Sequence, residues 1–444
     1  MTKTVGDHAI VVGAGMGGLA AAAALSPVFA KVTVLDKDDL SGSGVRLGVG
    51  QGSHTHQLLK AGEDTLERML PGIRAELYAA GGHQIRVGKD VTVLDAMGLL
   101  PEHDTGFTVT ALSRPKYEGI LRARVAALPN VSLRGDTPVA GARIENGRCL
   151  GVTLGDGEQL DADLVIDASG MNGPLSAQLA ADGAAEYETE TVGINVAYTT
   201  AIFEKPAAWR GNNQGMFVLP GPPSKHFALL LPIEDDQWTI SLGARGGAPM
   251  PKDREEFLAF AKELALPGVF ERISEAKATT PYRTFRKPQA VRRKFGAAAK
   301  WPERLLPLGD AITHFNPTFG QGMTVAALQA GQLARLLGER AASGGGLDGL
   351  AAAYFSPAEG VAAAAWGLAL SVDYAFDETV GERPADFAQS QFAGRVMRQM
   401  AQTDMEIFTL RLRVGHMLES PAAMREGPLG ERIGTAIRAA AAAG

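Results

Sequence analysis

The N-terminal segment 8–36 carries the clearest hydrophobic pattern of the chain. An apolar run is followed by a glycine-rich turn, an alanine-rich stretch and a second apolar run that ends at Asp36. A short apolar run bounded by turn residues is typical of a buried strand, whereas a longer alanine-rich stretch favours a helix. The segment therefore predicts a strand, a helix and a second strand, joined as a βαβ unit.

Helical patterns return in several later segments. Ser53 is expected to cap a helix that Pro71 and the glycine after it stop, and residues 113–128 predict another helix. A long helix is expected after Gly322, and mainly helical segments follow it to the end of the chain. The alanine-rich residues 435–444 are expected to fray.

Strand-like alternation occupies the middle of the chain. Short alternating segments lie at 83–112 and 130–167, and longer ones fill 187–245. Such longer segments are typical of an antiparallel sheet. An apolar strand is expected at 305–308. Together these elements predict an α/β fold: a Rossmann-type domain interleaved with an antiparallel-sheet domain, followed by C-terminal helices.

Composition narrows the class of protein. Of the 444 residues, 45% are hydrophobic and 21% charged, which is typical of a folded globular protein. The net charge of −6 and the lack of a polybasic block argue against nucleic-acid binding. The sequence shows neither a signal-peptide pattern nor an apolar run long enough for a membrane span. The single Cys149 excludes an intramolecular disulfide and a multi-cysteine metal site, so we expect no metal centre. A chain without disulfides, signal peptide or membrane span is expected to be cytoplasmic.

A glycine motif joins the first strand to the first helix. Gly13-x-Gly15-x-x-Gly18 combines a tight turn, close backbone approach to a pyrophosphate and close packing of the helix on the strand. Asp36 lies at the distance expected of a ribose-binding acid. With the strand and helix in place, the motif predicts a dinucleotide site rather than a simple glycine-rich turn. The neighbouring candidates are Ala14, Met16, Gly17 and Lys37.

A second glycine-rich segment follows the strand at 305–308. It contains Gly309-Asp310, a turn at Asn316-Pro317, and Gly320-x-Gly322 at the start of the long helix. The segment resembles the C-terminal flavin signature of the FAD monooxygenases of the p-hydroxybenzoate hydroxylase fold, which include squalene epoxidase. A helix N-terminus favours the negative charge of reduced flavin. The alternative interpretation is an ordinary junction of strand, turn and helix.

The resemblance implies a role for each matching residue of this segment. Asp310 would meet the ribityl chain of FAD, and the glycines would bring backbone N–H groups to the pyrimidine edge of the flavin. Met323 falls on a further flavin position of squalene epoxidase. The candidates are Gly309, Asp310, Pro317, Gly320, Gln321, Gly322 and Met323.

Three more positions match the same family in chain order. Arg114 matches an arginine that meets FAD, Val139 a backbone position beside the adenine, and Arg46 the arginine-bearing loop after the ribose-binding acid. Taken alone, either arginine could equally be a solvated surface charge.

The middle motif departs from the family pattern. An Asp-Gly pair implicated in both FAD and NAD(P)H binding is expected where this chain has Ser169-Gly170, and the acid is displaced to Asp167. Gly170 stays a candidate for the cofactor. The electron source is therefore NAD(P)H acting directly or through a separate flavin reductase.

The most detailed resemblance is to bacterial FAD-dependent epoxidases of polyether pathways, which oxidise polyene polyketides. It rests on GVGQGSHTHQLL at 48–59, on 231–247, on 309–323 and on the helical stretch 365–374, and covers nearly the whole chain. It implies transfer of one oxygen atom from O2 through a C4a-hydroperoxyflavin, with epoxidation of a lipophilic polyketide or terpenoid-like alkene. Because the flavin would carry this chemistry, no catalytic side chain is named.

Other functions stay open. An aromatic hydroxylase and a geranylgeranyl-reductase-like enzyme share this FAD fold, and a flavin-binding carrier or sensor without turnover is a different class. No tryptophan lies in the WxWxIP signature of the halogenases. His54 and His56 suit either a role beside the flavin or helix-start capping and packing, while His314 lies beside the expected flavin ring.

The resemblance also divides the chain. The expected FAD-binding domain comprises 1–80, 105–185 and 285–345, and the substrate-binding sheet domain comprises 81–104 and 186–284. Residues 346–444 form the C-terminal helical region.

Overall fold

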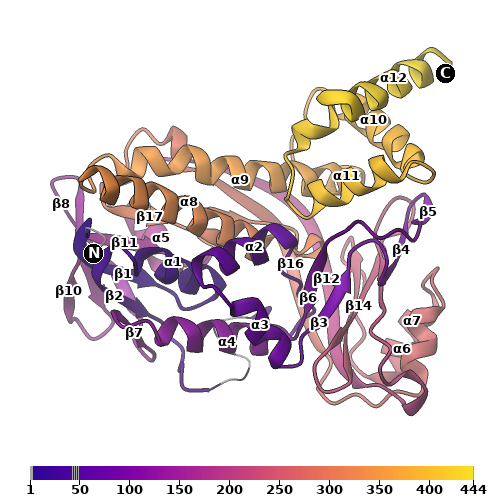
Figure 1. Ribbon diagram of the computed structural model, residues 1–444, viewed down its shortest axis with the longest axis horizontal. Coiled ribbons are helices and arrows are strands. Elements are labelled where there is room, and N and C mark those ends of the chain that lie inside the picture. The colour runs from indigo at the N-terminus through magenta and orange to yellow at the C-terminus, as the bar shows by residue number, and fades with distance from the viewer. Residues whose placement is uncertain (1–3, 43, 45, 47, 49, 444) are drawn as a thin grey trace.

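A five-stranded parallel sheet carries the N-terminal βαβ unit (Figure 1). The computed structural model describes residues 4–443 except 43, 45, 47 and 49. The helix α1 (Met16–Leu25) connects the first two strands, as the sequence predicts. In spatial order the strands are β17 (Leu305–Pro307), β11 (Leu164–Asp167), β1 (Gly6–Val12), β2 (Phe29–Leu35) and β7 (Val131–Arg134).

The central strand β1 packs on both of its faces. Ala9 and Val11 belong to one hydrophobic cluster with helices, whereas Ile10 and Val12 belong to another cluster on the opposite face. Helix α1, α4 (Arg114–Ala126), α8 (Gly322–Ser343) and α9 (Leu350–Asp373) contribute to the first cluster. The second is covered by β8 (Val139–Glu145), β9 (Arg148–Leu154), β10 (Gln159–Asp161) and α5 (Pro174–Ala181). Burial on both faces explains why β1 reads as a continuous apolar run.

An eight-stranded sheet forms the second half of the fold. Its pairs are antiparallel except for the parallel pair β13–β4, and α6 (Arg254–Lys262) and α7 (Gly268–Ser274) pack on one face. The order is β18 (Thr313–His314), β16 (Arg283–Lys294), β12 (Glu188–Glu204), β15 (Gln237–Arg245), β14 (His226–Ile233), β13 (Gly215–Val218), β4 (Val91–Asp95) and β5 (Gly98–Leu99). The α/β fold with an antiparallel second sheet is therefore confirmed.

The short strand β18 ties the two sheets together. It follows β17 of the parallel sheet closely along the chain, yet it pairs with β16 of the eight-stranded sheet, His314 lying opposite Val291. Strand β16 spans the expected boundary at 285. The segment after β17 thus runs directly along the junction between the sheets.

The expected helix start at Ser53 is wrong. Helix α2 begins at Lys60 and ends at Met69, before α3 (Ile73–Ala79). Tertiary contacts hold the preceding segment out of a helix, because the Leu59 N–H donates to Thr324 Oγ1 of α8 and Thr55 bonds Thr239 of the large sheet. A two-stranded sheet of β3 (His83–Arg86) and β6 (Thr108–Ala111) completes this region.

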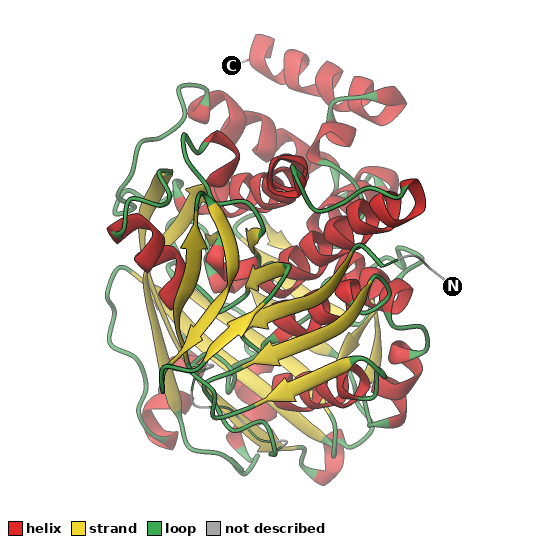
Figure 2. Cartoon of the chain, turned by 90° about the vertical axis from the view of Figure 1, so that its left-hand side faces the viewer, coloured by secondary structure: helices red, strands yellow, loops and turns green. Residues whose placement is uncertain are grey.

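The last helices lie at the outer edge of the molecule in both views (Figures 1 and 2). They are α10 (Phe387–Met400), α11 (Met405–Gly415) and α12 (Gly427–Ala443). The expected fraying at 435–444 is wrong as far as Ala443, since α12 stays helical and buries Ile433 in a cluster with α11. Within residues 4–443, apart from the four omitted positions, no helix combines the length and hydrophobicity needed to cross a bilayer.

Candidate functional site

A cavity of about 530 Å³ lies where the two sheets meet. Residues at the carboxyl ends of β1, β2 and β11 line it, together with the N-terminal residues of α1 and α8. This is the usual position of a ligand site in an open parallel sheet. Every cofactor-binding residue expected from the sequence lines the cavity except Ala14 and Gly18, as far as the described residues show.

The glycine-rich turn explains those two exceptions. A Cβ on Gly18 would overlap the Gly13 carbonyl oxygen, so Gly18 lets α1 pack on the turn. Gly13 has a φ of +102°, which favours glycine. At Gly15, by contrast, the nearest atom to an added Cβ among the described residues is Arg46 Nη2, at 3.7 Å. The backbone at Gly15 is therefore open to a ligand, and Ala14 instead donates its N–H to Asp36 Oδ2, at 2.6 Å.

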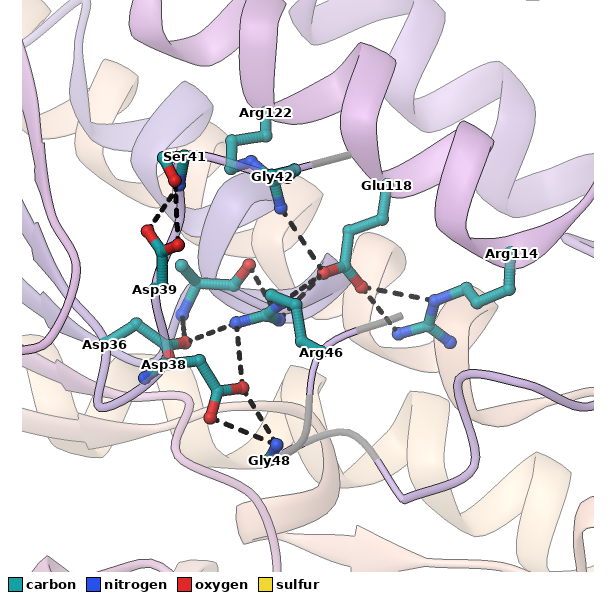
Figure 3. Close-up of polar contacts among 11 residues, drawn as sticks. Asp36, Asp38, Asp39, Ser41, Gly42, Arg46, Gly48, Arg114, Glu118 and Arg122 are labelled. Carbon is teal, nitrogen blue, oxygen red and sulfur yellow. Dashed lines mark hydrogen bonds and ion pairs between the residues drawn. The ribbon is translucent and has the colours of Figure 1, made fainter. Parts of the chain in front are cut away.

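Asp36 is held by a network of buried charges (Figure 3). Its Oδ2 also accepts from Arg46 Nη1 at 2.8 Å, and its Oδ1 accepts from the Asp38 N–H at 2.9 Å. Burial opposes the charge of Arg46, yet the neighbouring carboxylates of Glu118 and Asp36 raise its pKa above the usual value. Arg46 is therefore a buried ion-pair partner and not a solvated surface charge.

Glu118 is a residue that the sequence reasoning missed. Its carboxylate lies 2.7 Å from Arg46 Nη2 and 3.1 Å from Arg114 Nη2, so it joins both expected arginines (Figure 3). The signal was present, because Glu118 lies four residues after Arg114 on a predicted helix, a spacing at which opposite charges meet. Its link to Arg46 across the fold could not be read from the spacing.

The second glycine-rich segment forms the other end of the cavity. Gly320 has a φ of +64°, and the Asn316 side chain accepts the Thr318 N–H, which shapes the turn before α8. Thr318 Oγ1 and Gln321 Oε1 are buried and have no hydrogen-bond partner among the described residues, and both residues line the cavity. Buried polar atoms normally have partners, so this end suits a ligand with hydrogen-bonding edges.

These features fit FAD. The N-termini of α1 and α8 both reach the cavity, and a helix N-terminus stabilises an anionic group such as a pyrophosphate. The open backbone at Gly15 and the unpartnered atoms near Gly320 suit a dinucleotide with a polar ring at one end. The residues present thus provide room, donors and acceptors for the cofactor that the sequence predicts.

The wall contributed by the eight-stranded sheet is neutral and largely aromatic. Strands β12, β14 and β16 contribute Tyr198, Phe227, Leu229 and Phe285 to the cavity, and β15 contributes Ser241. No charged residue from these strands lines the cavity within the described part of the chain. Such a wall suits an apolar molecule.

A row of hydroxyl groups leads from the cavity into the protein, with Thr55 and Ser241 at the lining and Thr200 buried. Ser241 Oγ lies 2.6 Å from Thr200 Oγ1 and 3.0 Å from Thr55 Oγ1, and Thr200 Oγ1 lies 2.7 Å from His54 Nδ1. Burial, with a smaller contribution from Arg283, lowers the pKa of His54 to about 4, so this imidazole is neutral at pH 7. His54 packs between strands, as one of its two interpretations expects, but it caps no helix.

The other two candidate histidines, His56 and His314, line the cavity. His56 lines it, and burial and the charge of Arg114 lower its pKa to about 3. His314 also lines it, with Nε2 at 3.6 Å from Asp310 Oδ2. His56 caps no helix, because α2 begins only at Lys60.

The displaced acid of the middle motif is buried outside the described cavity lining. Asp167 is buried, and its carboxylate accepts hydrogen bonds from Ser169 Oγ and Ser176 Oγ. Burial raises its pKa above the usual value. Ser169 and Gly170 line the cavity, whereas Asp167 is absent from the described lining.

Comparison with known proteins finds a matching family model and a related protein. Residues 7–369 match a family model described as an FAD binding domain. Protein Rv3254 of Mycobacterium tuberculosis is 32% identical over 367 residues, which cover 77% of this chain and 75% of that protein.

Solved structures share the fold. The flavin-dependent brominase Bmp2 aligns with a TM-score of 0.68 and 15% identity, over 99% of this chain and 100% of that chain. A mutant of 2-methyl-3-hydroxypyridine-5-carboxylic acid oxygenase aligns with a TM-score of 0.64 and 17% identity, over 90% of this chain and 94% of that chain. These similarities support the fold and leave the substrate open.

Proposed function

This chain belongs to the FAD binding domain family, and we propose that it is an FAD-dependent monooxygenase that epoxidises an alkene of a lipophilic polyketide or terpenoid-like molecule. The observation that carries the proposal is the neutral aromatic wall of Tyr198, Phe227 and Phe285, which belongs to the same cavity as the cofactor-binding turns. An ionised substrate would have no charged partner on this wall, whereas an alkene needs none.

We assign the cofactor to the parallel-sheet half. Asp36, fixed by Ala14 and Arg46, would accept from the adenosine ribose, and the N-terminus of α1 would hold the pyrophosphate. Asp310 would meet the ribityl chain, and the α8 N-terminus with Gln321 would hold the pyrimidine edge of the ring. When bound, FAD supplies the activation of O2. The eight-stranded sheet would orient the alkene and exclude water.

We propose that a separate flavin reductase supplies the electrons for this enzyme. In the family the middle motif places an acid where NAD(P)H docks, and here Asp167 is buried and bonded to two serines. A stopped-flow experiment tests this, with NADH or NADPH mixed with the FAD-loaded enzyme in the absence of any reductase. Slow reduction supports the partner reductase, and reduction within a catalytic turnover contradicts it.

The oxygenase reaction is tested with FAD-loaded enzyme, a flavin reductase supplied with NADH, ¹⁸O2 and farnesol as a probe alkene. We expect one ¹⁸O atom per epoxide product. Phe285→Ala should lower the rate by removing part of the wall, and Phe260→Ala, on α6 and absent from the described cavity lining, should leave it unchanged. Equal rates for the two variants would show that the aromatic wall does not contribute to epoxidation.

The same experiment separates the other functions. Labelled oxygen in 4-hydroxybenzoate but not in farnesol would identify an aromatic hydroxylase. Saturation of an alkene without consumption of O2 would identify a geranylgeranyl-reductase-like enzyme. Reduction of bound FAD without any turned-over substrate would leave only a flavin carrier or sensor.

A further inference from the structure

We propose that Lys287 is a positioning residue that favours the reduced state of the bound flavin, acting through His314. The inference rests on the proposed FAD site and concerns a lysine that the sequence reasoning did not single out. Lys287 is buried, its side chain contacts His314, and Asp310 lies near the other nitrogen of that imidazole ring.

Lys287 is a buried cation in the sheet wall. It lies on β16, two residues after the cavity-lining Phe285, and successive even-numbered steps along a strand share one face. The residue is only 3% exposed. Its Nζ contacts Nδ1 of His314, the residue on β18 that lines the cavity. The imidazole of His314 thus lies between Lys287 and the cavity.

The contacts define the direction of the hydrogen bonds. A lysine ammonium can only donate, so His314 Nδ1 accepts from Lys287 and the ring proton lies on Nε2. That nitrogen lies 3.6 Å from Asp310 Oδ2, which is close to the carboxylate but longer than a hydrogen bond. Met171 Sδ, 3.2 Å from His314 Nδ1, is only a weak acceptor and cannot replace the lysine as donor. The result is a chain of ammonium, neutral imidazole and carboxylate.

The charge of Lys287 persists near neutral pH. Burial lowers the pKa of Lys287 to about 8, against an opposing effect of Asp310, so the amine is mainly protonated at pH 7. Burial also lowers the pKa of His314, which keeps the imidazole neutral. Arg293, the other cation beside this group, is bound to the carbonyl oxygens of Ala311 and Met171 at 2.8 Å each.

This arrangement acts on a negative charge that appears in the cavity. Asp310 and His314 line the same end of the cavity as the α8 N-terminus, where the reduced flavin would carry its charge. A cation in a poorly hydrated site is weakly screened. Lys287 therefore stabilises the negative charge of the reduced flavin although His314 lies between them. Without Lys287, the Asp310 carboxylate would face the reduced flavin with less compensation.

The test measures the midpoint potential of the bound FAD by equilibration with a reference dye during slow enzymatic reduction. For Lys287→Met we expect the preference for reduced over oxidised FAD to fall about tenfold, seen as a lower potential. Lys287→Arg keeps the charge and should retain most of that preference. Lys287→Gln provides a second neutral variant.

Lys205 offers a matched control. It is also 3% exposed, but it lies beyond the end of β12, where Nζ bonds Asn213 at 3.0 Å, and it does not line the cavity in the described part of the chain. Lys205→Met should leave the potential unchanged. Thermal unfolding of each variant shows whether the fold is kept.

The outcomes are distinct. Equal potentials for the wild type, Lys287→Met and Lys287→Gln, each with FAD bound, would overturn the inference and leave the proposed function standing. An equal fall for Lys205→Met would also overturn it, because the effect would not depend on position. A wild-type protein that binds no FAD would instead refute the proposed function, and the inference with it.

Discussion

At the scale of single residues, buried charge decides most of the site. Asp36, Arg46 and Glu118 are each less than one-tenth exposed, and each carboxylate bonds the same guanidinium. A buried charge that loses its partner is costly, so such a network must be complete to be stable. The arginine therefore matters both for the fold and for the position of Asp36.

Arg46→Met leaves two buried carboxylates without their shared partner. We expect a loss of ~3 kcal/mol in the free energy of unfolding and weaker FAD binding, since Asp36 loses its restraint. Urea denaturation of the apoprotein and a titration with FAD check both. Arg335→Met removes an exposed pair with Glu339 at 2.7 Å and should change the stability by less than about 0.5 kcal/mol. Equal effects of the two substitutions would contradict the prediction.

His54 makes the stability depend on pH. Its pKa is about 4 in the folded protein, mainly because of burial, against 6.5 in the unfolded chain. The unfolded state therefore binds the proton first, and stability is complete above pH ~6.5 and falls as the pH drops to about 4. The full loss is roughly 3 kcal/mol for this one group.

Urea denaturation at pH 7.0, 5.5 and 4.5 measures that loss. His54→Gln keeps a polar side chain that does not titrate, so its stability should fall less steeply over the same pH range. Other buried histidines still contribute, and the comparison isolates His54. An identical pH dependence in the variant would show that His54 is already protonated or solvated in the folded protein.

At the scale of elements, a buried ion pair joins three segments around the turn before α8. Arg245 on β15 and Asp373 at the end of α9 are fully buried and lie 2.5 Å apart. The same carboxylate oxygen accepts from Asn316 Nδ2 at 2.7 Å, and Asn316 in turn shapes the turn before α8. The pair therefore links the C-terminal helices to the cofactor end of the cavity.

Either partner of this pair should be more costly to remove than both. We expect Asp373→Leu or Arg245→Leu alone to lower the free energy of unfolding by about 3 to 5 kcal/mol, because one buried charge stays unpaired. The double variant should recover part of the loss. A double-mutant cycle by urea denaturation measures the coupling, and additive effects would show that the two charges do not interact.

At the scale of the whole molecule, the cavity lies between both sheets. Its lining comes from the parallel sheet, from the eight-stranded sheet and from the β18 segment that joins them. A ligand held there contacts both halves and should stabilise them together. The C-terminal helices contribute to the fold through a separate hydrophobic cluster.

FAD should therefore raise the stability of the two halves as one unit. At a free FAD concentration of 100 times its Kd, the gain is ~2.7 kcal/mol. Calorimetry with and without FAD checks this, and we expect a single transition that moves to higher temperature. Two transitions of which only one moves would show that the sheets unfold independently. ADP, which lacks the ring, provides a control for binding by the glycine-rich turn alone.

Local patterns were enough to predict much of this protein. The βαβ unit follows from apolar runs around Gly13, Gly15 and Gly18, and the antiparallel sheet from alternation at 187–245. These features depend on neighbours in the sequence, as turns, helix starts and strand faces do. The cofactor candidates followed because the motifs combine such local geometry with a known chemistry.

Tertiary structure decided the rest, because it depends on residues far apart in the chain. Ser53 begins no helix, since contacts with Thr239 and α8 hold the segment after it out of a helix. His54 bonds Thr200, 146 residues away, and Glu118 joins Arg46 across 72 residues. The sequence by itself determined the strands, turns and helix starts that can bind a dinucleotide. Only the packing of the two sheets decided which charges are buried together, because burial and pairing depend on distances in space that no local pattern records.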